Sequence, residues 1–362
     1  MKVLIIQLKR IGDVLLSTPL ANTLKMNFPD VEIDFITSPG EKGVLEGNPN
    51  ISEIILLTNE ERKNKLKFLK KMLYIRQKKY DVVFNVNGKL EGMLITFFSR
   101  AKKRVGWDKK GWKIVNTLSV NSEKFRKKTG TAAQTIDDRL AMLTATFGDI
   151  KLDSEFHIWL STQEIEHTRE LMVRSGVDFT KPIIPIGITS RRWYRVWEFE
   201  KFVAMSHHLI EKYDAQIIPF YAPNEKAYID SYIEAMKSSA VKRVETKNVR
   251  ELAAMMQLST IYFGNENGPR HVAQAVGTPS YVIFRDNIST HWFLPTGNPM
   301  HKIVTYQTAY GLTDEEFHAL FSLTKEELFA KYEISLEFVK EDFDKMVTQL
   351  GIFKNRDDKG KN

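Results

Sequence analysis

A carboxylate stands directly after the first apolar strand that the sequence predicts. In LKRIGDVLLSTPL, residues 8–20, the apolar run ends, Gly12 allows a tight turn, and Asp13 begins a helical pattern. Open α/β sheets bind ligands at the carboxyl ends of their strands, so we expect Asp13 to project into a binding cleft. Aspartate is also a favourable helix N-cap, and Arg10 beside it fits either an anion partner or an open surface. Position alone leaves these alternatives open.

A second strand end carries the pattern of an anion site. In FGNENGPRHVAQAVGTPSYVIF, residues 263–284, a strand leads through Glu266, Asn267 and Gly268 into a helix. Backbone N–H groups at such a glycine-rich helix start bind anions, and a diphosphate would fit there. His271 could donate to a phosphate or a sugar hydroxyl, or could be structural. Neither a GxGxxG motif nor a P-loop lysine pattern is present, so a nicotinamide or ATP site of those types is not supported.

Hydroxyl and guanidinium groups gather after a third strand. The segment GITSRRWYRVWEFEKF, residues 187–202, contains Thr189, Ser190, Arg191, Arg192 and Arg195. Guanidinium groups suit bidentate contacts with phosphate. The aromatic residues among them could stack on a base or a sugar, or could pack in the core; they are Trp193, Tyr194 and Trp197. Basic residues interleaved with aromatic ones also occur in proteins that bind single-stranded nucleic acid.

A further carboxylate follows a fourth strand. Glu225, in the segment FYAPNEKAYID, lies where a helix is expected to begin. A carboxylate at a strand end often accepts hydrogen bonds from ribose hydroxyls. A negative charge at a helix start is also favoured by the helix dipole, so Glu225 alone does not discriminate between the two.

The elements that must position these residues alternate between strand and helix. In the first half we expect strands at residues 3–8, 31–36, 51–57 and 80–86, and helices at 14–26, 60–79 and 131–147. Residues 108–130 are basic and are expected to form an excursion or a mobile loop. Such alternation indicates right-handed βαβ units and a parallel sheet.

The second half repeats this rhythm. We expect strands at residues 183–188, 216–221, 260–264 and 280–284, and helices at 198–212, 224–236, 249–258 and 269–276. The pattern predicts an α/β protein with two Rossmann-like domains, residues 1–165 and 175–330, whose parallel sheets face a central cleft. A final helix at 335–350 has one apolar stripe and could pack back on the first domain. Residues 354–362 are expected to be disordered.

The composition limits the possible classes of protein. A chain of 362 residues suits two domains, and 43% hydrophobic with 27% charged residues is typical of a soluble protein. The absence of cysteine excludes disulfides, thiolate metal sites and cysteine nucleophiles. No apolar run reaches the ~18 residues that span a bilayer, and the first apolar run is too short for a signal peptide, so we expect a cytoplasmic protein. The net charge of +8 favours anionic partners or is simply a solvated basic surface.

Taken together and in order, these segments resemble glycosyltransferase family 9, the family of the ADP-heptose:lipopolysaccharide heptosyltransferases, which has the GT-B fold. The resemblance spans roughly residues 1–300 and the final helix. It is carried by RIGDVLLSTPLANTLKMNFPDVEIDFITSP, YDVVFNVNGKLEG, KRVGW and NENGPRHVAQAVGTP. The ordered set is specific, whereas no single piece would be.

The resemblance implies an inverting transfer of a heptose or a related sugar from an ADP-activated donor to a lipopolysaccharide or lipooligosaccharide core. Asp13 would be the general base that takes the proton of the acceptor hydroxyl. The implied donor-binding residues are Gly12, Thr189, Ser190, Arg195, Glu225, Glu266, Asn267, Gly268 and His271. We expect acceptor contacts from Arg10, Lys89 and Arg104, and neither a metal nor a cofactor.

The expected partners are a nucleotide sugar and a lipid-linked anionic glycan, with peripheral contact at the inner face of the cytoplasmic membrane and without nucleic acid. Basic residues of the first half suit an anionic interface. They are Arg76, Lys78, Lys79, Arg100, Lys102, Lys103, Arg104 and the stretch 109–128.

Several positions depart from the family pattern. Glu266 stands where the family usually has aspartate, Asn267 where it has serine, and Arg270 where a small apolar residue is common. After Phe284 the family's Gly-Pro-Thr-rich loop is replaced by RDNIST, and residues 300–333 have no clear counterpart. These departures leave the donor sugar and its base open.

Four alternatives remain at this point. The chain could transfer another nucleotide sugar to a surface glycan, or could be a GT-B-like nucleotide-sugar epimerase. It could bind a sugar nucleotide without turnover, or it could bind nucleic acid through the basic and aromatic loop.

Overall fold

The computed structural model describes residues 1–129, 133–288 and 298–353. The chain divides into two compact units, of which the first is Met1–Trp159 and the second begins at Leu160. None of the helices in these ranges is long and apolar enough to cross a membrane. The predicted disordered tail, residues 354–362, lies outside the described residues.

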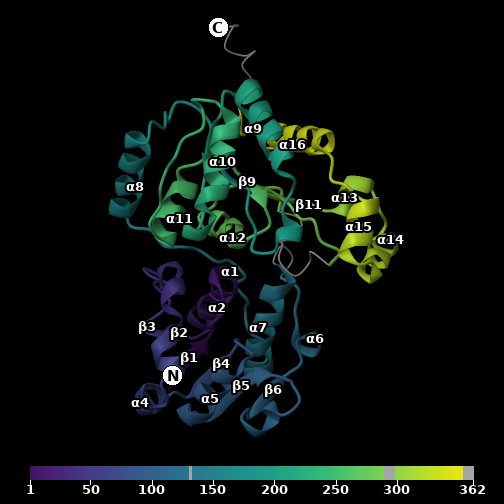
Figure 1. Ribbon diagram of the computed structural model, residues 1–362. Helices are drawn as coiled ribbons and strands as arrows, with labels where there is room; N and C mark the ends of the chain where they lie inside the picture. Colours follow the sequence, from purple (N-terminus) through teal and green to yellow (C-terminus); the bar gives the residue numbers. More distant parts are fainter. Residues whose placement is uncertain (130–132, 289–297, 354–362) are drawn as a thin grey trace. The chain divides into compact units, whose positions relative to one another are not determined.

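The first unit contains a six-stranded parallel sheet (Figure 1). Its strands are β1 (Lys2–Ile6), β2 (Glu32–Thr37), β3 (Glu53–Leu56), β4 (Val82–Asn85), β5 (Lys103–Trp107) and β6 (Leu118–Val120). They lie in the order β3-β2-β1-β4-β5-β6, and Ile5 of β1 pairs with Phe35 on one side and Phe84 on the other. This is the strand order of a Rossmann fold.

Helices cover both faces of this sheet. They are α1 (Ile11–Leu15), α2 (Pro19–Asn27), α3 (Asn59–Lys63), α4 (Lys65–Gln77), α5 (Leu90–Ser99), α6 (Ser122–Phe125) and α7 (Gln134–Phe147), with 3₁₀ helices η1 (Pro39–Val44) and η2 (Trp112–Ile114). Buried side chains of α4 and α5 pack against Leu4, Ile6 and Val83. The chain crosses from β1 to β2 in one direction along the sheet, and from β3 to β4 and then to β5 in the opposite direction. Because parallel crossovers are right-handed, α2 lies on one face of the sheet, and α4 and α5 lie on the other.

Three expectations for this unit were wrong. The helix expected at 14–26 is two helices, because the chain turns after Leu15 and Pro19 starts α2. The helix expected at 60–79 is interrupted at Asn64, whose extended backbone and side chain cap α4. The stretch 108–130 contains β6 and α6 instead of only a loop. Helix α5 and strand β5 had not been predicted as elements.

The second unit contains a five-stranded parallel sheet in the order β11-β10-β9-β7-β8. Its strands are β7 (Ile183–Gly187), β8 (Gln216–Pro219), β9 (Tyr262–Asn265), β10 (Ser280–Ile283) and β11 (His301–Val304). Its helices are α8 (Thr162–Arg174), α9 (Phe199–Tyr213), α10 (Lys226–Met236), α11 (Val249–Gln257), α12 (Gly268–Ala275), α13 (Tyr306–Tyr310), α14 (Asp314–Ala319), α15 (Lys325–Lys331) and α16 (Leu336–Leu350), with 3₁₀ helices η3 (Trp193–Arg195), η4 (Pro223–Glu225) and η5 (Leu320–Ser322). The predicted α/β class with two parallel sheets is confirmed.

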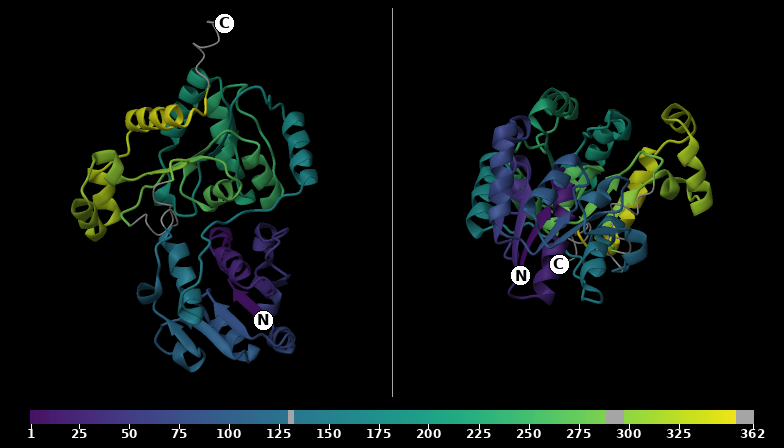
Figure 2. Two further views of the ribbon diagram at one scale, coloured as in Figure 1. Left: turned by 180° about the vertical axis from the view of Figure 1, so that it is seen from behind. Right: turned by 90° about the horizontal axis from the view of Figure 1, so that it is seen from below.

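The last helix packs in the core of the second unit. We had expected that it could pack back on the first domain, but its stripe of Val339, Phe343 and Val347 is buried in one cluster with Phe263 and Tyr281 of the second sheet. Figure 2 shows α16 in yellow beside α9. Apolar contact with the sheet therefore decides which unit holds this helix.

Two glycines allow a close approach of β7 and β9. A Cβ atom on Gly264 would lie 2.5 Å from the carbonyl oxygen of Gly187, which no side chain tolerates. The central strands of the second sheet therefore require glycine at this point, directly before the loops that carry the predicted donor-binding residues.

Candidate active site

Asp13 lies in the first turn of α1, immediately after β1. The N-cap of α1 is Arg10, and no side chain bonds the backbone there, so Asp13 is not the cap that its position had allowed. Its side chain is 35% exposed. A carboxylate at the carboxyl end of the central strand is therefore accessible to a substrate.

Arg139 of α7 holds this carboxylate. One terminal nitrogen of Arg139 donates to Asp13 Oδ1 at 2.8 Å, and the other donates to the main-chain oxygen of Asp13 at 2.8 Å. Burial lowers the pKa of Arg139 to about 10, while the charge of Asp13 acts in the opposite direction, so Arg139 is cationic at neutral pH. Oδ2 accepts no hydrogen bond from the described residues. One oxygen is fixed and the other is available, as a general base requires.

Arg10 and Lys89, two of the predicted acceptor contacts, lie at the same edge of the first sheet as Asp13. The side chain of Asn87 accepts from the backbone N–H of Leu8 at 3.2 Å, which joins the loops after β1 and β4. Lys89 follows as the exposed N-cap of α5, and Arg10 is also exposed. Arg10 opposes the effect of burial, which raises the pKa of Glu41 in η1. Arg10 and Lys89 are thus exposed cations at the same carboxyl edge as Asp13.

Arg104 does not join them. It is the second residue of β5, near the amino end of that strand. Its Nε donates to the carbonyl of Val115 at 2.7 Å and a terminal nitrogen to that of Ala101 at 2.9 Å. The structure therefore gives Arg104 a role in holding local backbone, away from the carboxyl edge, and its acceptor contact stays a prediction.

In the second unit, Asn267 ties two strand-end loops together. It is the N-cap of α12, where its Oδ1 accepts from the N–H of Arg270 at 3.3 Å. Its Nδ2 donates to the carbonyl of Thr189 at 3.3 Å, across to the loop after β7. No atom lies within 4 Å of a Cβ built on Gly268, so the described chain leaves the start of α12 open. An exposed helix start of this kind is suited to an anion.

Glu266, Arg270 and His271 form a buried polar cluster behind that helix start. A terminal nitrogen of Arg270 lies 3.4 Å from Glu266 Oε1 and 3.2 Å from His271 Nε2. Burial lowers the pKa of Arg270, and the carboxylate of Glu266 raises it. Arginine only donates, so His271 accepts at Nε2 and carries its proton on Nδ1. Two of the departures from the family pattern, Glu266 and Arg270, are therefore partners of each other.

Arg195 is held by a carboxylate that the sequence did not reveal. Its Nε donates to Oδ2 of the buried Asp286 at 2.6 Å, and Lys325 of α15 is bonded to the other oxygen of the same carboxylate. The terminal nitrogens of Arg195 have no partner among the described residues. Asp286 lies in the segment that replaces the family's loop. Lys325 is 39 residues further along the chain, so nothing in the sequence indicated that it would bond Asp286.

The remaining predicted residues occupy the same edge of the second sheet. Glu225 is half-buried after β8, and one of its oxygens accepts from the N–H of Ala222 at 2.9 Å. Thr189 and Ser190 follow β7 with partly exposed side chains. Trp197 is core, because its ring is fully buried and its Nε1 donates to the carbonyl of Ile334 at 2.8 Å. Trp193, in contrast, is 77% exposed.

The described residues contain no group of three or more His, Cys, Asp or Glu side chains that could hold a metal ion. Metal independence of the reaction stays a prediction.

Comparisons with known proteins agree with this architecture. The model of glycosyltransferase family 9 (heptosyltransferase) matches residues 68–342. The chain is 22% identical to lipopolysaccharide heptosyltransferase 3 of Escherichia coli over 78% of this chain and 82% of that protein. A family 9 glycosyl transferase from Veillonella parvula has a TM-score of 0.77 at 21% identity, covering 96% of each chain. The E. coli ADP-heptose lipopolysaccharide heptosyltransferase II has a TM-score of 0.73 at 16% identity, covering 97% of this chain and all of that one. The two Rossmann-like parallel sheets are those of the GT-B fold, and the chain belongs to glycosyltransferase family 9.

Proposed function

We propose that this glycosyltransferase moves a heptose, or a related sugar, from an ADP-activated donor to the core of a lipopolysaccharide or lipooligosaccharide, with inversion at the anomeric carbon. The observation that carries the proposal is the carboxylate of Asp13, of which Arg139 holds one oxygen and leaves the other available. The names of the relatives support the sugar and the acceptor: one is a lipopolysaccharide heptosyltransferase and another an ADP-heptose enzyme.

In this reaction Asp13 takes the proton of the acceptor hydroxyl while that oxygen attacks the anomeric carbon and ADP departs. Charge develops on the leaving diphosphate, and Arg195 with the open start of α12 stabilises it. Thr189, Ser190 and His271 contact the phosphates or the sugar, and Glu225 accepts from the ribose. Arg10 and Lys89 attract the anionic acceptor.

No cofactor takes part in the proposed reaction, and the donor is the only nucleotide required. The acceptor is a lipid-linked anionic glycan, so the enzyme works in the cytoplasm against the inner face of the membrane. The net charge of +8 supports an anionic partner of this kind. Nucleic acid has no place in this reaction.

A nucleotide panel with Asp13→Ala tests the proposal. ADP and ADP-heptose are expected to raise the melting temperature of the wild type, and UDP and GDP to leave it unchanged. Asp13→Ala is expected to keep ADP affinity while transfer falls by at least ~100-fold, the scale for loss of a general base. Stabilisation by UDP or GDP alone would overturn the ADP donor, and near-normal transfer by the variant would overturn the base.

Product analysis separates the remaining activities. Incubation with the sugar nucleotide alone is expected to leave it unchanged, because transfer needs an acceptor. Conversion of the sugar without an acceptor would instead identify an epimerase.

A further inference from the structure

Helix α4 presents a row of leucines to solvent. Leu66, Leu69 and Leu73 are three and four residues apart, so they share one side of the helix. Leu66 is 72% exposed, and the other two are nearly half exposed. The opposite side of α4 packs on the sheet through Met72 and Ile75. The fold requires the apolar side that carries Met72 and Ile75, so the leucine row is a second apolar side of α4.

Helix α5 also presents apolar side chains to solvent. It packs beside α4 on the first unit (Figure 1). Leu90 and Phe97 are 61% and 52% exposed, and the half-buried Leu94 lies between them at helical spacing. Exposed apolar side chains gathered on two neighbouring helices are typical of an interaction surface. We call these six residues of α4 and α5 the apolar face.

Unpaired cations flank the apolar face. On α4 they are Lys65, Lys70 and Arg76, and at the ends of α5 they are Lys89 and Arg100. None of these five has an ion pair with any described residue. Several cations predicted for an acidic interface are engaged elsewhere: Lys78 with Glu53, and Lys127 with Asp149.

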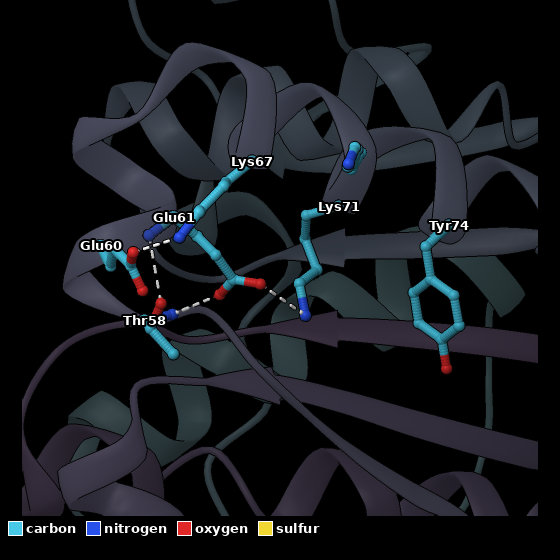
Figure 3. Close-up of a pocket in the computed structure, with 7 residues that line it drawn as sticks. Thr58, Glu60, Glu61, Lys67, Lys71 and Tyr74 are labelled. Atoms are coloured by element: carbon cyan, nitrogen blue, oxygen red, sulfur yellow. Dashed lines mark hydrogen bonds and ion pairs between the residues drawn. The ribbon is translucent and has the colours of Figure 1, made fainter.

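Figure 3 shows which lysines of α4 are already neutralised. Along the edge of α4 that faces α3, Lys67 is paired with Glu60, and Lys71 lies 3.0 Å from Glu61. These pairs line a hollow of about 430 Å³. Two of the three lysines that line this hollow are therefore neutralised, and only Lys70 keeps its charge free for an anionic partner.

We propose that the apolar face is the surface by which the protein lies on a bilayer containing anionic phospholipid. Apolar side chains flanked by lysine and arginine insert at the headgroup boundary, where the cations meet lipid phosphates. The inference deepens the proposed function, which needs a lipid-linked acceptor, by locating the surface.

The fold joins this face to the carboxylate of the first unit. Helix α5 begins at Leu90, three residues after Asn87, which bonds the loop between β1 and α1. The start of α5 and Asp13 therefore lie along the same edge of the sheet. A bilayer on the apolar face would bring the head of a membrane-held glycan toward that edge.

Vesicle co-sedimentation tests this surface. The wild type is expected to bind vesicles of phosphatidylcholine with added phosphatidylglycerol. It should bind only weakly to vesicles of phosphatidylcholine alone, and its binding to the mixed vesicles should decrease at high salt. One triple variant changes the leucines (Leu66→Gln, Leu69→Gln and Leu73→Gln), and the other changes the cations (Lys65→Gln, Lys70→Gln and Arg76→Gln). Each variant is expected to bind at least ~10-fold more weakly than the wild type, since each cation near an anionic surface contributes on the order of 1 kcal/mol. The matched controls are Met26→Gln on the exposed side of α2 and Val173→Gln on α8, which should bind as the wild type does.

Equal binding by the triple variants, or no binding by the wild type, would overturn the surface. All the changed side chains are exposed, and unchanged melting temperatures should show that the variants fold. Activity on a detergent-dispersed acceptor is expected to be retained by the leucine variant. Loss of all transfer with vesicle binding intact would instead count against the proposed function alone.

A second inference rests on the cluster around Asp286. The carboxylate of Asp286 is 2% exposed and receives both Arg195 and Lys325. Asn287 also bonds Lys325, and its own amide donates to the carbonyl of Leu320 at 2.7 Å. The ring centre of Tyr194 lies 6.0 Å from Arg195 Cζ and 5.2 Å from Lys325 Nζ. Two cations share one carboxylate, so the cluster keeps a net positive charge.

We infer that Lys325 is a second contact for the donor diphosphate beside Arg195, and that Asp286 is the positioning residue for both. Lys325 comes from the segment without a counterpart in the family pattern, and Asp286 from the replaced loop after β10. The side chain of Lys325 is 28% exposed, so it can reach a ligand. The inference rests on the proposed function, because it takes the nucleotide diphosphate as the ligand.

Calorimetry with ADP and AMP tests this contact. Lys325→Gln is expected to weaken ADP binding by ~10-fold or more, the scale of one charge-assisted hydrogen bond, and to weaken AMP binding less. Lys331→Gln, at the other end of α15, is the control and should bind both as the wild type does. Asp286→Asn is expected to raise the KM for the donor and leave the KM for the acceptor unchanged.

Unchanged ADP affinity in Lys325→Gln would overturn this inference alone. A wild type that binds no nucleotide would overturn it together with the proposed function. An equal rise of both KM values in Asp286→Asn would show a general structural role and would remove Asp286 as a positioning residue.

Discussion

Arg139 donates two hydrogen bonds to Asp13, one to the carboxylate oxygen Oδ1 and one to the main-chain oxygen, each at 2.8 Å. The pair joins residues 126 positions apart in the chain. Two parallel bonds from one planar guanidinium fix both the backbone of α1 and the direction of the carboxylate. Asp13 is therefore oriented before any substrate arrives, as its proposed role as the general base requires.

Arg139→Lys is expected to reduce kcat by ~10-fold or more while the affinity for ADP stays unchanged, because an ammonium cannot reproduce the fork of two bonds. Steady-state kinetics and calorimetry check the two quantities separately. Arg126→Lys is the matched control: Arg126 pairs with Asp138 at 2.9 Å in the same unit and does not touch Asp13. A similar loss of kcat in both variants would mean that the effect is general destabilisation.

Glu266 and Arg270 are expected to behave as a coupled pair. Arg270 is fully buried, so Arg270→Met would leave the Glu266 carboxylate buried without its partner, at a cost of about 3–5 kcal/mol in the free energy of unfolding. The double variant Glu266→Gln, Arg270→Met should be less destabilised than the sum of the single variants. Urea denaturation of all four proteins measures this coupling, and strict additivity would show that the two residues do not interact.

Asn267 is expected to contribute through both its cap and its cross-loop bond. Asn267→Ala should lower the free energy of unfolding by about 1 kcal/mol, the usual value of a helix N-cap. Asn267→Ser, the residue common in the family, can still cap α12 but cannot donate to Thr189, and should cost less. If the serine variant were as unstable as the alanine variant, the bond to Thr189 would be the dominant interaction.

The contact of α16 with α9 is expected to depend on pH through Asp344. Burial alone would raise the pKa of Asp344, but hydrogen bonds from His208, Lys212 and Tyr213 lower it to about 2. The folded pKa is below the ordinary 3.8, so this stabilisation is complete above about pH 3.8 and is lost as the pH falls through about 2.

Asp344→Asn should therefore lower the free energy of unfolding by about 2 kcal/mol at neutral pH, and its difference from the wild type should shrink as the pH falls below about 4. Denaturant titrations across this range measure the difference. Glu341→Gln, an exposed change on the same helix, should have little effect at any pH. A difference for Asp344→Asn that stays constant with pH would contradict the assignment.

The sequence by itself determined the class of the fold and the places where ligands could bind. Strands such as β1 and β7 are continuous apolar runs because parallel strands are buried on both faces, and glycine or polar residues mark where they end. Since ligands of α/β sheets gather at carboxyl ends, this was enough to point to Asp13 and to the loops that hold Arg195 and Asn267. The short strand β6 and the breaks at Pro19 and Asn64 gave weaker or ambiguous patterns.

Only the tertiary structure decided which side chains meet. Arg139, Asp286 and Lys325 are ordinary charged residues in the sequence, and their roles arise because packing brings them to Asp13 and Arg195. Arg104 looked like an acceptor contact, but register in the sheet places it near the amino end of β5. The apolar row of α4 has the same helical spacing as a core stripe, and only the burial of the opposite side shows that the row lies outside the core. Spacing along the chain specifies local structure, whereas partners distant in sequence depend on the packing of whole elements.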